Sequence, residues 1–81
     1  MSRYYFDLHN GEGPTTDDEG QEMPSREAVA REITRTLLDI ANEEITGSDR
    51  LVVTLTVRDD QDRTISVASL IFTNEWINDP Q

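Results

Sequence analysis

The sequence predicts an α+β domain of order β-β-α-β-β, in which an antiparallel four-stranded sheet carries one long helix on one face. Three observations predict this fold class: an aromatic segment of alternating polarity near the start, a single helical segment in the middle, and two β-branched segments after it. A chain of 81 residues is long enough for one domain only. We expect that domain to span residues 1–74 and a C-terminal tail to span residues 75–81.

The first strand is predicted by the segment RYYFDL, which holds three of the five aromatic residues of the chain. Tyr4, Phe6 and Leu8 alternate with Tyr5 and Asp7, so the first three share one face of a strand. We expect Tyr4 and Phe6 to pack beneath the helix, because an acidic chain offers no electrostatic attraction for a base-stacking platform.

Polar and glycine-rich residues follow this strand. Asn10 and Gly11 predict a turn, and the stretch from Asp17 to Gly20 fits a second, tight turn because glycine takes positive φ without strain. Around the second turn we expect a short, polar second strand.

The helix is predicted by the segment PSREAVAREITRTLLDIANEEITG. Ser25 is a good N-cap, and Gly47 is expected to end the helix. Apolar residues recur on one face at helical spacing: Val29, Ala30, Ile33, Leu37, Ile40, Ala41 and Ile45.

Three acidic residues near the end of this helix, Asp39, Glu43 and Glu44, oppose the helix dipole. They are either part of a generally acidic surface or a contact site for the arginines of a basic protein partner.

The last two strands are predicted by residues 51–57 and 64–72, joined by the tight polar turn RDDQDR. The first alternates cleanly, but the second is apolar on both faces: Ile65, Val67 and Ile71 fall on one face, and Ala68, Leu70 and Phe72 fall on the other.

One helix can cover one face of the sheet only, so the second apolar face needs another cover. Trp76 and Ile77 of the tail can pack back onto it, or a second copy of the chain can shield it. We expect a homodimer in which Ile65, Val67 and Ile71 contribute contacts, and we consider Trp76 and Ile77 candidates for binding a protein partner.

The charge of the chain argues against direct nucleic-acid binding. Seventeen acidic residues against seven arginines, with no lysine, give a formal net charge of -10, whereas nucleic acids attract basic surfaces. No apolar stretch approaches the roughly 20 residues of a membrane span, and no secretory signal is visible. We therefore expect a cytoplasmic protein that contacts neither nucleic acid nor membrane.

No chemistry-bearing motif stands out. The chain has no cysteine and a single histidine, His9, and its many carboxylates show no spacing that marks an acid–base pair or a calcium loop. We expect no catalytic residues, no metal and no cofactor.

The ordered set of motifs resembles a family of small bacterial proteins that is catalogued as a domain of unknown function and is frequent in soil and plant-associated bacteria. The motifs are RYYFDL, DDEGQEMPSREAVAREITRTL, VTLTVRDDQDR and SLIF, and the resemblance covers residues 3 to 73. Asp62 departs from the family, whose members often place glycine in the last turn. The resemblance implies the fold and assigns no activity.

A looser resemblance links residues 4 to 41 to antitoxin domains of HicB type, which also begin with a tyrosine-bearing strand followed by a helix. It is a fold-level analogy. Two hypotheses follow from the sequence as a whole: a non-catalytic, homodimeric protein-interaction module, or an acidic inhibitor, antitoxin-like or nucleic-acid-mimicking, that covers a basic partner.

Overall fold

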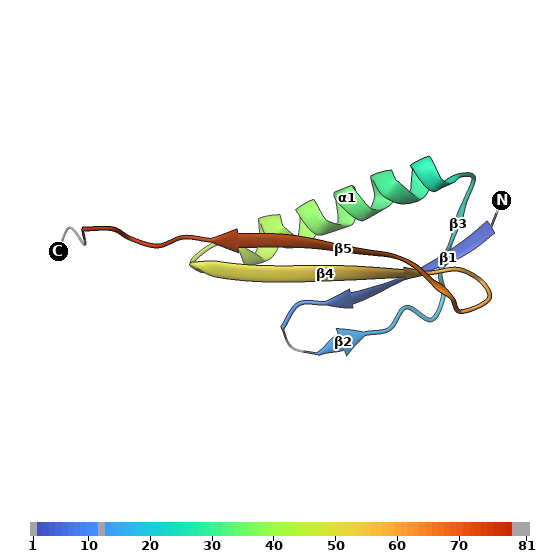
Figure 1. The fold of residues 1–81 in the computed structure, drawn as a ribbon, viewed down its shortest axis with the longest axis horizontal. Coiled ribbons are helices and arrows are strands. Elements are labelled where there is room, and N and C mark those ends of the chain that lie inside the picture. Colours follow the sequence, from blue (N-terminus) through green and yellow to red (C-terminus); the bar gives the residue numbers. More distant parts are fainter. Residues whose placement is uncertain (1, 12, 79–81) are drawn as a thin grey trace.

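The computed structural model describes residues 2–11 and 13–78 and confirms the predicted α+β class. One helix lies across one face of an antiparallel sheet of five strands (Figure 1). The elements in chain order are β1 (Ser2–His9), β2 (Pro14–Thr15), β3 (Gln21–Met23), α1 (Arg26–Glu44), β4 (Arg50–Arg58) and β5 (Thr64–Thr73). The sheet order is β2-β1-β4-β5, with β3 also paired to β1.

The predicted second strand is split into two short strands, which is why the sheet has five strands and not four. β2 pairs with Leu8 and His9, whereas β3 pairs with residues 2–4 at the other end of β1. Between them the side chain of Asp17 takes the place of a strand: the backbone N–H of Phe6 donates to its Oδ2 at 3.0 Å. The polar second strand predicted around the Asp17–Gly20 turn is thus present on both sides of that turn.

Gly20 ends this turn at a position that only glycine fits. Its φ is +73°, and a Cβ built there lies 2.9 Å from the carbonyl oxygen of Tyr4. Any side chain would therefore force β1 and the turn apart.

The helix begins as predicted and ends slightly earlier. The hydroxyl of Ser25 accepts the backbone N–H of Ala28 at 3.1 Å, which caps the first turn. The last helical residue is Glu44, three positions before the predicted end at Gly47. The bond from the backbone N–H of Ile45 to the carbonyl of Ala41 closes the final turn. Gly47 then takes the positive φ of +79° that redirects the chain.

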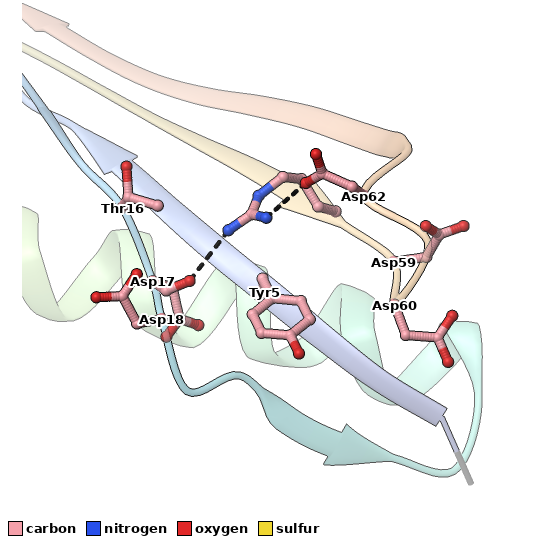
Figure 2. Close-up of a pocket in the computed structure, with 8 residues that line it drawn as sticks. Tyr5, Thr16, Asp17, Asp18, Asp59, Asp60 and Asp62 are labelled. Carbon is pink, nitrogen blue, oxygen red and sulfur yellow. Dashed lines mark hydrogen bonds and ion pairs between the residues drawn. The ribbon is translucent and has the colours of Figure 1, made fainter.

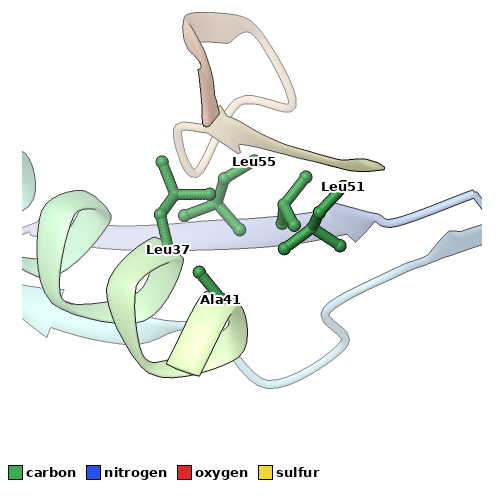
Figure 3. Close-up of a cluster of buried hydrophobic side chains, with 5 residues drawn as sticks. Leu37, Ala41, Leu51 and Leu55 are labelled. Carbon is green, nitrogen blue, oxygen red and sulfur yellow. The ribbon is translucent and has the colours of Figure 1, made fainter. Parts of the chain in front are cut away.

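The core lies between α1 and one face of β4. Val53, Leu55 and Val57 are at most 1% exposed, and Leu37 and Ala41 of the helix close over this strand (Figure 3). Phe6 packs against this cluster from β1, as predicted. Tyr4 is half-buried and lines a hollow beside the start of the helix.

β5 presents two different apolar faces, as its sequence predicts. Ala68, Leu70 and Phe72 pack against the core beneath the helix, while Val67 and Ile71 lie on the opposite face and are 64% and 67% exposed.

Ile65 does not share the face of Val67 and Ile71, which corrects the simple alternation. The register moves from Val57–Ser66 to Arg58–Thr64, so Ile65 is an extra residue in β5. This bulge reverses the alternation. Ile65 lines a hollow with residues of the N-terminal half of α1.

No helix in the described part of the chain is both long and apolar enough to cross a bilayer.

Candidate interaction surface

The face of the sheet opposite α1 carries exposed apolar side chains. Val52 of β4 lies directly opposite Ile71 of β5, and the two are 46% and 67% exposed. Val67 continues the row along β5. We call Val52, Val67 and Ile71 the open-face patch; within residues 2–11 and 13–78 no helix or strand lies over it (Figure 1).

β5 also leaves one long edge of the sheet without a neighbouring strand among the described residues, because it is the last strand in the sheet order. The backbone N–H of Asn74 donates to the carbonyl of Asp49 at 2.7 Å, so Asn74 points its backbone groups toward β4. Successive residues of an antiparallel strand alternate between its two neighbours. The residues whose N–H and C=O point outward are therefore Val67, Ser69, Ile71 and Thr73, which we call the free edge.

The free edge belongs to a strand without a single charged side chain. β5 reads TISVASLIFT in a chain in which 30% of residues are charged. Arg63 directly precedes the strand, and Glu75 lies two residues after its end. The strand thus combines exposed backbone groups with exposed apolar side chains and no electrostatic barrier.

Trp76 and Ile77 do not pack back onto the sheet. They are 71% and 75% exposed, and the chain after β5 runs away from the sheet (Figure 1). Both side chains are available to a partner. The end of the predicted tail, residues 79–81, lies outside the described residues.

The three acidic residues near the end of α1 are all exposed, but two have partners within the chain. Asp39 accepts a hydrogen bond from Arg35 at 2.9 Å, and Glu44 accepts one from the side chain of Asn10 at 3.1 Å. Glu43 is exposed beside them. The helix end therefore carries acidic charge that is partly balanced by neighbouring donors.

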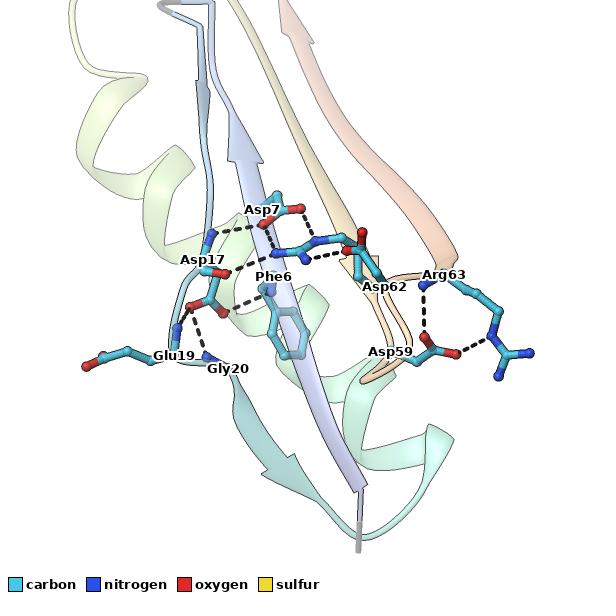
Figure 4. A network of polar contacts seen from close by, with 9 residues as sticks. Phe6, Asp7, Asp17, Glu19, Gly20, Asp59, Asp62 and Arg63 are labelled. Atoms are coloured by element: carbon cyan, nitrogen blue, oxygen red, sulfur yellow. Dashed lines mark hydrogen bonds and ion pairs between the residues drawn. The ribbon is translucent and has the colours of Figure 1, made fainter.

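A polar cluster on the open face brings together Asp7, Asp17 and Asp62 (Figure 4), which all contact Arg58 at the end of β4. Its guanidinium binds both carboxylate oxygens of Asp7, at 2.7 and 3.0 Å, and also contacts Asp62 at 2.7 Å and the carbonyl of Asp17 at 3.0 Å. The Tyr5 ring lies beneath it, 5.0 Å from ring centroid to Cζ. Arg58 therefore joins β1, the loop before β3 and the β4–β5 turn.

Asp7 and Asp17 are held in their ionised forms by these contacts. Hydrogen bonding from Arg58 lowers the pKa of Asp7, against a smaller opposing effect of burial. Partial burial raises the pKa of Asp17, but hydrogen bonds from the backbone N–H groups of Phe6, Gly20 and Glu19 together outweigh it, so the net pKa is lowered. Carboxylates engaged in this way are poor proton acceptors.

An acidic hollow surrounds this cluster, lined chiefly by aspartates (Figure 2). Asp18 and Asp60 are exposed on its rim, whereas Asp59 accepts two backbone N–H groups of its own turn. Among the residues that the structure describes, no group of three or more histidine, cysteine, aspartate or glutamate side chains is arranged to hold a metal ion.

Two features of this surface were not predicted from the sequence. The Arg58–Asp7 pair joins residues 51 positions apart, and only the strand order brings them together. The second feature is the free edge, because which backbone groups of β5 point outward depends on which strand ends the sheet. The available signal for the first was Arg58, a cation that ends a strand whose other residues after Arg50 are all apolar or threonine.

Comparison with models of protein families gives a match for this chain. Residues 3–71 match the model described as Domain of unknown function (DUF6894). The chain belongs to this family. The DUF6894 match includes Val52, Val67 and Ile71 of the open-face patch and ends before Trp76. Searches of curated proteins and of solved structures found no match, and none of the comparisons supports the resemblance to HicB-type antitoxins.

Proposed function

We propose that this DUF6894 protein is a non-catalytic interaction module that forms a homodimer through β5. The observation that carries the proposal is the free edge: an exposed, ten-residue terminal strand without charge in a strongly acidic chain. Proteins that remain monomeric usually protect such edges with charged residues, proline or bulges. The only such device in β5 is the bulge at Ile65, at its first end.

The charge distribution allows a second copy as the partner at this edge. Two chains of net charge -10 repel one another, so a close contact between them is least costly where acidic side chains are absent. β5 supplies such a place, and its side chains on the open face are apolar or hydroxyl-bearing. An identical strand is also self-complementary under two-fold symmetry, the commonest symmetry of oligomers.

The polar clusters support a role without catalysis. Every nitrogen of the Arg58 guanidinium already has an oxygen partner within the chain. Asp7 and Asp17 are likewise bound to donors and have lowered pKa values. These groups stabilise the junction of three segments and are not poised to move a proton.

The proposal is tested by removing one outward N–H group. Ser69→Pro deletes a donor that does not bond to β4, and proline is tolerated on a strand whose N–H faces solvent. We expect sedimentation equilibrium to give twice the chain mass for the wild type and a large shift toward monomer for Ser69→Pro, with the circular dichroism spectrum retained.

Val52→Glu is the matched control, because Val52 lies on the open face of a central strand and has no free-edge groups. It should stay dimeric if the edge carries the contact. A wild type that sediments as a monomer at millimolar concentration would overturn the proposal. Dissociation by Val52→Glu, with Ser69→Pro still dimeric, would replace the edge by a face-to-face contact.

An acidic inhibitor of a basic protein is the second candidate. It is supported by the exposed acids at the end of α1 and by the rim of the acidic hollow. Salt separates the two candidates: screening weakens an acidic–basic complex, whereas it relieves repulsion between two acidic copies. Homodimer affinity that rises between 50 and 300 mM NaCl, where the Debye length falls to roughly 40% of its starting value, supports the first candidate. Tight, salt-sensitive binding to an arginine-rich peptide, abolished by replacing Asp39, Glu43 and Glu44 with neutral amides, supports the second.

A further inference from the structure

We infer that two copies pair antiparallel along residues 67–73, with the two-fold axis at Leu70. This inference rests on the proposed homodimer and specifies its register. The register follows from the outward backbone groups of β5 and from the bulge at Ile65, and one exposed leucine on the helix supports a contact across the same edge.

The outward groups define the stretch that can pair. Val67 and Thr73 are the first and last members of the free edge, as established from the Asn74–Asp49 hydrogen bond. Before Val67 the bulge at Ile65 interrupts the regular alternation of donors and acceptors. The regular part of the edge is therefore a segment of seven residues whose midpoint is Leu70.

A two-fold axis at that midpoint satisfies every outward group. Val67 then lies opposite Thr73 of the second copy, and Ser69 lies opposite Ile71, each as a hydrogen-bonded pair; symmetry repeats both pairs. An axis at Ser69 instead places Thr73 opposite the bulged Ile65. That alternative leaves outward groups of Thr73 without a regular partner, which carries a free-energy cost.

The side chains under the helices also fit this register. Leu70 faces Leu70 of the second copy across the axis as a non-hydrogen-bonded pair, the closer of the two antiparallel arrangements. Ala68 faces Phe72, so a small side chain meets a large one. All three already pack against the core of their own copy, and the dimer would join the two cores beneath the helices.

Leu38 of α1 supports a contact across the free edge, whichever residue lies on the axis. It is 56% exposed, although its neighbour Leu37 is buried in the core. Thr36, on the other side of Leu37, lines a hollow with Phe6 and Leu8 of β1. Because successive helical residues are rotated by about 100°, Leu38 lies on the flank toward β5. A second copy across the free edge would cover this flank of the helix.

Cysteine cross-linking tests the register cleanly because the natural chain has no cysteine. Single variants Ser69→Cys and Ile71→Cys place thiols on exposed or solvent-facing positions of the open face. In the inferred register these two positions face each other with Cα atoms about 5.5 Å apart, within disulfide range. A mixture of both variants under mild oxidation should give the mixed disulfide as the predominant product, and either variant alone should give little.

The outcomes separate the register from the dimer itself. Efficient cross-linking of Ser69→Cys alone would move the axis to Ser69 and overturn the inference while keeping the homodimer. A dimer by sedimentation that yields no disulfide in any combination would also overturn it. A second variant, Leu70→Cys, should cross-link alone, and its circular dichroism spectrum reports whether it folds. A monomeric wild type refutes the proposed function and the register together.

Discussion

Asp17 organises the turn that splits the second strand, and Asp17→Ala tests that role. Its carboxylate accepts backbone N–H groups from Phe6 at 3.0 Å, from Glu19 at 3.1 Å and from Gly20 at 3.1 Å. The contacts of Phe6 and Gly20 are partly buried, whereas that of Glu19 is exposed. Water replaces the exposed contact in the variant but reaches the other two less well.

The expected loss follows from those two partly buried contacts. A hydrogen bond to a charged group contributes about 1.5–3 kcal/mol, and partial solvation in the variant reduces this. We expect Asp17→Ala to lower the free energy of unfolding by about 2–4 kcal/mol. That is a large fraction of the roughly 5–15 kcal/mol typical of small domains.

Urea denaturation followed by circular dichroism measures the loss. Asp18→Ala is the matched control: it removes an adjacent, exposed carboxylate, and we expect a change within about 0.5 kcal/mol. Equal midpoints for Asp17→Ala and the wild type would show that the carboxylate does not hold the turn to β1, and the account of the split strand would be wrong.

Three further predictions concern stability. Phe6→Ala should lower the free energy of unfolding by about 2–4 kcal/mol, less than for a fully buried ring, whereas Tyr5→Ala should cost under about 1 kcal/mol; urea midpoints separate the two. Asp62→Gly should leave stability unchanged or raise it, because relief of the positive φ of 65° outweighs a contact whose carboxylate is 79% exposed; a thermal melt that drops by several degrees would contradict this. The folded-state pKa values of Asp7 and Asp17 are lowered. The stabilisation by these two carboxylates is therefore complete above about pH 5 and is lost as the pH falls below about 4, through their folded-state pKa values. The free energy of unfolding should not decline between pH 7 and 5 and should decline between about pH 4 and 2.5.

Local signals account for the elements that were predicted correctly. Ser25 caps the helix through a contact only three residues away, and the alternation of β4 follows from its own side chains. The features that were not predicted depend on residues far apart in the chain. Asp17 splits the second strand by binding Phe6 from 11 residues away, and the bulge at Ile65 depends on how the turn before it sets the register.

The same distinction applies to the interaction surface. Exposed Val67 and Ile71 follow from the doubly apolar pattern of the last strand. That β5 ends the sheet, and that Arg58 meets Asp7, follow only from the strand order. Sequence periodicity describes faces within one strand and contains no information about its neighbours.

Amide hydrogen exchange along β5, followed by NMR at several protein concentrations, tests the central claim most directly. In the homodimer the outward amides of Val67, Ser69, Ile71 and Thr73 are hydrogen-bonded to the second copy. We predict that they are protected at high concentration and lose protection on dilution, while the inward amides of Ala68 and Leu70, bonded to β4, stay protected throughout. Rapid exchange of the four outward amides at every concentration would contradict the claim that the free edge of β5 is the self-association site.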